Sequence, residues 1–367
     1  MIFNTVLEVD KVETRLLELP FYKKFTSSKA SKQTRKIVIV KIYSGRHSGY
    51  GECQALEEPI YSDETPESCF EIISSKISKI LLNSQTSCKE FIQTQVAGPM
   101  TIAGVEMALL DLSLKTNSQS LSEALSVDKQ QVPAGAVVGI GSDVVEQCIA
   151  LSSQGYKRLK IKIEPGFDIK PISNIQDAID GTQIDVDGNG SYDNSTVSNL
   201  LELAKIGVTC FEQPFDASDF NSAKSFLKLL KPNQFVVADE AATSLEAVKN
   251  LINQHAANAI SIKPARFGGI QRTIEVIDYC VENSVALTAG GMLETGLGRS
   301  VISTIAALDG FALTGDITPA SHWFRSQPWP DLKILDGSIK IPKVEGLCGE
   351  PDETLLEQFT IRKKITP

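Results

Sequence analysis

The chain has 367 residues, an ordinary globular composition and a net charge of −9, without any block of basic residues. This charge pattern argues against nucleic acid and membrane surfaces as partners, and no apolar run approaches the roughly 20 residues that cross a bilayer. The N-terminus lacks the pattern of a signal peptide, and the seven cysteines never form a Cys-x-x-Cys pair. We therefore expect a cytoplasmic protein with reduced thiols and no zinc–cysteine site.

The first third of the chain mixes strand and helix signals. Residues 36–43 predict a strand, with Gly49 and Gly51 near the turn that follows it. Residues 67–82 and 103–115 have helical periodicity. Because strands precede helices here without alternating with them, this part of the chain is typical of an α+β unit.

From about Val132 onward, short apolar strands alternate with amphipathic helices, which predicts a parallel β/α barrel. The expected strands are residues 136–139, 158–163, 184–186, 210–211, 235–238, 259–262, 286–288 and 311–313. The helices between them include residues 144–153, 197–206 and 245–254.

After Leu313, prolines interrupt the regular pattern and leave one strand-like stretch at residues 338–341. We expect this tail to return to the N-terminal unit. The predicted domains are therefore an α+β unit at residues 1–128, a barrel at 129–320 and a tail at 321–367.

Five charged residues stand at the ends of successive barrel strands: Lys162, Asp187, Glu212, Asp239 and Lys263, spaced by 24 to 27 residues. One βα unit of a barrel has about this length, so the five side chains should meet at the C-terminal mouth, where barrel enzymes carry their active sites. A single acid at a strand end is more often a helix cap or part of a surface ion pair. A shared site is favoured because all five charged residues occupy the same position in successive βα units.

Three neighbouring carboxylates without a cation would repel one another and lose hydration. Asp187, Glu212 and Asp239 therefore predict a divalent metal site. Oxygen ligands without a nearby histidine or cysteine indicate Mg²⁺, with Mn²⁺ as a substitute.

The two lysines of the series lie on opposite sides of the acids. A substrate carboxylate at the metal would present its α-carbon between Lys162 and Lys263, and the metal and a cationic side chain would stabilise the enediolate left after proton removal. Lys160 shares a strand face with Lys162 and adds a second positive charge. Together with burial and the dication, this charge should lower the pKa of Lys162 and let it act as a base.

These residues resemble the enolase superfamily in its muconate-lactonising branch, and in particular the o-succinylbenzoate synthase and N-succinylamino acid racemase group. The resemblance is carried by Gly49–Ser62, Val105–Lys115, Gly155–Gly166, Ile262–Gly269 and Gly290–Arg299. It implies a modified TIM barrel, (β/α)7β, with an N-terminal α+β capping domain that the C-terminal tail completes.

The resemblance also implies roles for individual residues. Lys162 and Lys263 would be the acid/base groups on the two faces of the substrate, supported by Lys160. The implied metal ligands are Asp187, Glu212 and Asp239; the next shell would hold Asn189 and Glu240; and the succinyl part of the substrate would meet Gly290, Gly291 and Met292. Two capping loops, near residues 20–30 and 56–63, would cover the mouth.

Two positions leave alternatives open. Val137 stands on the first barrel strand where the resemblance implies a hydroxyl near the substrate. Arg266, three residues past Lys263, is as compatible with tuning the pKa of that lysine as with pairing to a surface acid.

The expected activity is that of an o-succinylbenzoate synthase, a Mg²⁺-dependent lyase of menaquinone biosynthesis that dehydrates a succinyl-hydroxycyclohexadiene carboxylate in syn fashion. The alternative is an N-succinylamino acid (N-acylamino acid) racemase, an isomerase using the same two lysines. A dipeptide epimerase would carry Asp-x-Asp after about the eighth strand, and residues 288–293 contain none. The expected partner is a small-molecule carboxylate, and self-association into a homo-oligomer stays open.

Overall fold

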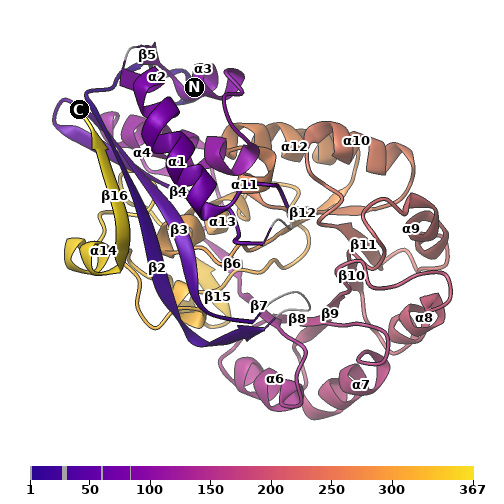
Figure 1. Ribbon diagram of the computed structural model, residues 1–367. Coiled ribbons are helices and arrows are strands. Elements are labelled where there is room, and N and C mark those ends of the chain that lie inside the picture. The colour runs from indigo at the N-terminus through magenta and orange to yellow at the C-terminus, as the bar shows by residue number, and fades with distance from the viewer. Residues whose placement is uncertain (1, 27–30, 59–60, 83) are drawn as a thin grey trace.

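The computed structural model describes residues 2–26, 31–58, 61–82 and 84–367. Figure 1 shows an antiparallel sheet with its own helices standing beside a curled parallel sheet, which an arc of helices surrounds. No helix in these ranges is long and apolar enough to cross a membrane. The domain boundaries proposed from the sequence, at residues 128 and 320, stay predictions.

The N-terminal sheet has the strand order β16-β2-β3-β4. Its strands are β2 (Lys11–Thr26), β3 (Ser31–Ser44), β4 (His47–Cys53) and β16 (Thr360–Thr366). The strand expected at residues 36–43 is confirmed within β3. The long strand β2 was not anticipated from the sequence pattern. β16 pairs antiparallel with β2, which confirms the return of the C-terminal tail.

Helix α4 (Pro99–Thr116) lies directly on strand β4. Gly49 and Gly51 fall inside β4, and not near the turn where the sequence pattern put them. A Cβ atom at Gly51 would stand 2.0 Å from the carbonyl oxygen of Gly104, so only glycine permits this contact. The shorter helical elements of this domain are α1 (Pro66–Ile72), the π-helical turn η2 (Ile73–Ile77), α2 (Ser78–Leu82), α3 (Cys88–Gln93) and α5 (Leu121–Ala124).

Seven parallel strands form the barrel sheet, in the order β13-β12-β11-β10-β9-β8-β7. They are β7 (Gly135–Val138), β8 (Arg158–Lys162), β9 (Gln183–Asp187), β10 (Cys210–Glu212), β11 (Phe235–Ala238), β12 (Ala259–Ile262) and β13 (Ala286–Ala289). The helices outside them are α6 (Val144–Ser153), α7 (Ile169–Ala178), α8 (Val197–Lys205), α9 (Phe220–Leu227), α10 (Leu245–Asn253), α11 (Pro264–Phe267), α12 (Ile270–Glu282) and α13 (Gly296–Ile305). The predicted alternation of strands and helices is confirmed.

The predicted eighth strand, residues 311–313, is wrong. An irregular stretch, residues 313–318, which we call the closing segment, lies between the first and last barrel strands instead. Its amides at Leu313 and Asp316 donate to the carbonyls of Leu287 (3.2 Å) and Ala289 (2.7 Å). Between these two bonds the closing segment advances by three residues and β13 by two, so the segment has one extra residue and the regular ladder is broken. On the other side, the amide of Gly135 donates to the carbonyl of Ile317 at 3.2 Å.

The strand-like stretch at 338–341 becomes β15 (Ser338–Lys340), which pairs with β6 (Gln131–Pro133) and β14 (Ile334–Leu335) and not with the capping sheet. The tail reaches the capping domain through α14 (Glu353–Phe359) and β16.

Two buried carboxylates hold the capping domain on the barrel. Glu106 of α4 accepts from the amides of Ile270 (3.1 Å) and Gln271 (3.0 Å) at the start of α12. Glu52 of β4 accepts from the amide and hydroxyl of Thr295, the residue that caps α13. The positive end of each helix thus receives an acid from the other domain. This fixes the capping domain over the barrel mouth.

Candidate active site

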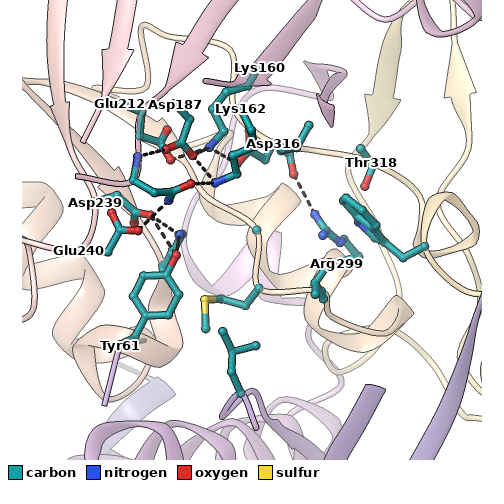
Figure 2. A pocket seen from close by; sticks show the side chains of 18 residues that line it. Tyr61, Lys160, Lys162, Asp187, Glu212, Asp239, Glu240, Arg299, Asp316 and Thr318 are labelled. Carbon is teal, nitrogen blue, oxygen red and sulfur yellow. Dashed lines mark hydrogen bonds and ion pairs between the residues drawn. The ribbon is translucent and has the colours of Figure 1, made fainter. Parts of the chain in front are cut away.

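The carboxyl ends of the barrel strands form a cavity beneath the capping domain, drawn in Figure 2. Nearly all the residues predicted for the site line it. They are Lys160, Lys162, Asp187, Asn189, Glu212, Asp239, Glu240, Lys263, Gly291 and Met292.

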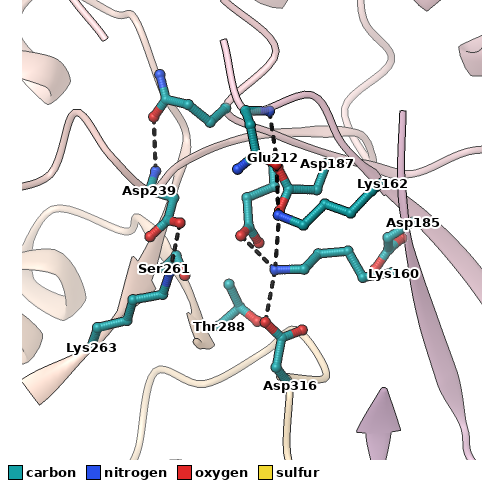
Figure 3. A network of polar contacts seen from close by, with 12 residues as sticks. Lys160, Lys162, Asp185, Asp187, Glu212, Asp239, Ser261, Lys263, Thr288 and Asp316 are labelled. Atoms are coloured by element: carbon teal, nitrogen blue, oxygen red, sulfur yellow. Dashed lines mark hydrogen bonds and ion pairs between the residues drawn. The ribbon is translucent and has the colours of Figure 1, made fainter. Parts of the chain in front are cut away.

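The five charged strand ends are in register. Lys162, Asp187 and Glu212 are the last residues of β8, β9 and β10, and Asp187 lies opposite both of the others in the ladders. Asp239 and Lys263 directly follow β11 and β12. Figure 3 shows Lys263 on one side of the carboxylates and Lys162 on the other. The predicted convergence of the five side chains is therefore confirmed.

Each of the three central carboxylates is bonded to a lysine. Lys162 Nζ lies 2.6 Å from Asp187 Oδ2, and Lys263 Nζ lies 2.6 Å from Asp239 Oδ2. Lys160 Nζ lies 2.5 Å from Glu212 Oε1. With the lysines bonded to the acids in this way, no group of three or more His, Cys, Asp or Glu side chains among the described residues has the spacing of a metal site.

The donor set nevertheless fits a hard cation. Burial raises the pKa of Glu212 to about 8, and the carboxylates of Asp187 and Asp239 add to this effect while Lys160 opposes it. The three acids therefore interact electrostatically with one another. Glu240 Oε2, also in the cavity wall, is buried without a hydrogen-bond partner in the described parts of the chain. Oxygen donors of this kind suit a divalent ion.

The protein's own groups raise the pKa of Lys162, and the predicted lowering, which includes the charge of a bound dication, stays a prediction. Burial and the Lys160 ammonium do lower this pKa, but the adjacent Asp187 carboxylate outweighs them and the pKa is raised. Asn189 fixes the same ammonium: its Oδ1 accepts from Lys162 Nζ at 2.7 Å, and its Nδ2 donates to Glu240 at 2.8 Å. Lys162 is thus held in one orientation by two acceptors.

Lys160 belongs to a buried ion network that includes a residue the sequence did not single out. Asp316, on the closing segment, accepts from Lys160 Nζ at 2.7 Å and from Arg158 Nη1 at 2.5 Å. Arg158 also pairs with Asp185 at 2.8 Å. Asp316 could have been found from its position after the seventh barrel strand. It was missed because the closing segment has no strand pattern that marks an eighth position.

The closing segment also corrects the search for an Asp-x-Asp pattern. Residues 288–293 belong to β13 and its loop, the seventh position of the barrel. The eighth position has the sequence Asp316-Ile317-Thr318, which contains a single acid. That acid forms ion pairs with Lys160 and Arg158.

Around Lys263, the structure shows two further contacts. Its Nζ donates to the hydroxyl of Tyr61 at 2.6 Å, and that hydroxyl donates to Asp239 at 3.0 Å. Arg266 is buried and bonds to Asp239, so pairing with a surface acid is wrong. Burial alone would raise the pKa of Asp239, but Lys263 and Arg266 hold it below its usual value. Tyr61 comes from a capping loop, which has no periodic signal.

Gly290 does not line the cavity, whereas Gly291 and Met292 do. A Cβ atom at Gly290 would lie 2.5 Å from Lys263 Cε, so this glycine makes room for the lysine side chain. From the second capping loop, Leu56 and Tyr61 line the cavity; residues 59–60, and 27–30 of the first loop, lie outside the described residues. Residues 20–26 of the predicted first loop are part of strand β2, where the amide of Tyr22 donates to the carbonyl of Trp323, a residue of the cavity wall, at 2.6 Å.

Comparison with known proteins defines the class. Residues 143–355 match the enolase C-terminal domain-like family, and residues 11–126 match the N-terminal domain of the mandelate racemase / muconate lactonizing enzyme family. The chain therefore belongs to the enolase superfamily. A solved member of that superfamily from Listeria innocua superposes with a TM-score of 0.90 at 27% identity, covering 98% of this chain and 99% of the other.

Two curated relatives narrow the comparison. The chain is 29% identical over 368 residues to the o-succinylbenzoate synthase of Bacillus subtilis, covering 98% of this chain and 99% of the relative. It is 27% identical over 367 residues to the N-succinylamino acid racemase of an Amycolatopsis species, covering 97% and 99%. The family resemblance predicted from the sequence, and the prediction of an enzyme, are confirmed.

Proposed function

We propose that this enzyme is an o-succinylbenzoate synthase, which removes the α-proton of a succinyl-hydroxycyclohexadiene carboxylate and expels its hydroxyl group as water. The observation that carries the proposal is the placement of Lys162 and Lys263 on opposite sides of three carboxylates, at the mouth of one barrel. Synthases that match this chain over nearly their whole length support it.

Asp187, Glu212 and Asp239 would hold a divalent cation, Mg²⁺ or Mn²⁺, through their carboxylate oxygens. When bound, the ion would supply positive charge against the negative charge that develops on the substrate carboxylate. It would also take over charge balance from the ammonium groups that now bond to these acids, which frees Lys162 and Lys263 to face the substrate.

In the dehydration, neutral Lys162 takes the α-proton onto Nζ and then gives it to the departing hydroxide on the same face, forming water. Asn189, bonded to Nζ at 2.7 Å, keeps the amine directed at the substrate. Lys263 on the other face contributes positive charge and need not move a proton. Lys160, bonded to Asp316 and Glu212, adds positive charge beside the substrate carboxylate.

N-succinylamino acid racemisation is the second candidate, and the two-sided placement of the lysines favours it equally. One lysine would remove the α-proton and the other would deliver a proton to the opposite face, inverting the centre. Arg266 and Lys263 both bond to Asp239, so Arg266 would help to hold the carboxylate that positions Lys263. Racemisation therefore needs both lysines, and dehydration needs Lys162.

The test is the turnover of both substrates by Lys162→Ala and Lys263→Ala, with exposed Lys205→Ala as the matched control. Lys162→Ala should lower both activities at least about 100-fold, the usual minimum for a lost acid/base group. Lys263→Ala should lower racemisation as much and dehydration less. Near-normal turnover by Lys162→Ala in both assays would refute the assignment.

A chelator provides an independent check. Treatment with EDTA should abolish turnover, and added Mg²⁺ should restore it. An enzyme that keeps full activity after exhaustive chelation and dialysis would show that the three carboxylates serve another purpose.

A further inference from the structure

The cavity has a second polar end, away from the three central carboxylates. Thr318 and Arg299 line it, and Figure 2 draws them on the side opposite Asp239 and Glu240. None of the steps proposed above uses either residue.

Thr318 presents a buried hydroxyl that has no hydrogen-bond partner among the described residues. The residue is 1% exposed, and its Oγ1 bonds to no group in the described parts of the chain. An unsatisfied buried hydroxyl is costly, so a hydroxyl on a cavity wall is best explained by a polar group that enters the cavity.

Arg299 is fixed next to the closing segment. Its Nη1 donates to the carbonyl of Asp316 at 2.8 Å, and its Nη2 pairs with Glu294 at 2.9 Å, while Nε has no partner among the described residues. A Cβ atom at Gly291 would lie 2.9 Å from Arg299 Nη2. The absence of a side chain at Gly291 therefore leaves the guanidinium close to the cavity.

The position of Thr318 also accounts for a departure seen in the sequence. Val137 lines the cavity on β7, where the family resemblance implies a hydroxyl. The closing segment lies directly beside β7, since the amide of Gly135 bonds to the carbonyl of Ile317. A hydroxyl missing from the first barrel strand can thus be replaced by one from its neighbour across the closure.

We propose that Thr318 and Arg299 form the subsite for the terminal carboxylate of the substrate's succinyl arm, with the Thr318 hydroxyl donating to one of its oxygens. This inference rests on the proposed function. With one carboxylate at the acid cluster and the α-carbon between the lysines, a substrate with a second carboxylate spans the cavity. Thr318 is then a specificity residue that selects succinyl over uncharged acyl groups.

The test measures KM and kcat of Thr318→Val and Thr318→Ser for both succinyl substrates, with exposed Ser321→Ala as control. Thr318→Val should raise KM roughly tenfold, as expected for a lost hydrogen bond to a charged group, and should change kcat little. Thr318→Ser should stay near wild type. N-acetylamino acids, which lack the second carboxylate, should show no such increase in KM.

A rescue variant separates a binding role from a folding role. Adding Val137→Ser to Thr318→Val returns a hydroxyl to the neighbouring strand and should recover most of the lost affinity. Suppose that the wild type turns over a succinyl substrate, but Thr318→Val keeps its KM or loses affinity equally for acetyl and succinyl compounds. The subsite is then refuted, while the proposed function stands. If the wild type turns over no succinyl substrate, the proposed function itself fails.

Discussion

Replacing Asp316 with Asn should destabilise the protein far more than breaking a surface ion pair of similar length. The Asp316 carboxylate is nearly buried and bonds to Arg158 at 2.5 Å and Lys160 at 2.7 Å. The Asn amide group has the same shape but carries no charge, and its NH₂ would face a cation. Removing one partner of a buried pair costs about 3 to 5 kcal/mol. Because Arg158 keeps Asp185 and Lys160 keeps Glu212, we expect a cost of about 3 kcal/mol.

The matched control is Glu202→Gln, which breaks the exposed pair between Glu202 and Lys205 at 2.6 Å. That pair should contribute no more than about 0.5 kcal/mol. Urea unfolding followed by circular dichroism, in EDTA so that no metal adds to stability, measures both variants. With a slope of about 3 kcal/mol per molar urea, Asp316→Asn should unfold at a midpoint about 1 M lower. Equal midpoints for the two variants would refute the importance of the buried network.

Three further predictions concern other contacts. Gly290→Ala should abolish racemisation and lower dehydration less, as expected for Lys263→Ala, because its Cβ would displace the Lys263 side chain; normal racemisation would contradict this. Gly51→Ala should lower the unfolding free energy by about 1 to 3 kcal/mol, since its Cβ would collide with the backbone of α4, and unchanged calorimetric melting would contradict it. Burial raises the pKa of Glu106 to about 7, from 4.5 in the unfolded chain. Between these pH values the folded state holds a proton that the unfolded state has lost. The free energy of unfolding should therefore fall by about 3 kcal/mol as the pH rises from 4.5 to about 7. Glu106→Gln should show a correspondingly flatter stability curve between these pH values, and an identical curve would count against the raised pKa.

The part of the site that was predictable from the sequence is the part governed by a repeat. A βα unit has a nearly constant length, so Lys162, Asp187, Glu212, Asp239 and Lys263 kept their phase and met at one mouth. Strand and helix positions in the barrel followed from the same alternation. Residues outside the repeat carried no such signal. Tyr61 sits on a capping loop, and Asp316 and Thr318 sit on the closing segment.

The errors have physical causes of the same kind. Phe311–Leu313 is apolar like a strand, but an extra residue in the closing segment prevents a regular ladder. Strand β2 was also missed; the carbonyl of Pro20 within it accepts from the amide of Arg325 at 3.2 Å. The ion pair between Lys162 and Asp187, at 2.6 Å, was not predicted either, because sequence spacing does not set a distance of that precision.

The pairing of β16 with β2 links the final residues of the chain to nearly the first. A ribosome synthesises a chain from its N-terminus, so β2 leaves the ribosome long before β16. Until β16 has been synthesised, one side of β2 offers unpaired backbone groups to strands of other chains. A chain truncated before Thr360 would keep every lysine and carboxylate of the barrel mouth, yet β2 would be an unpaired edge strand prone to aggregation.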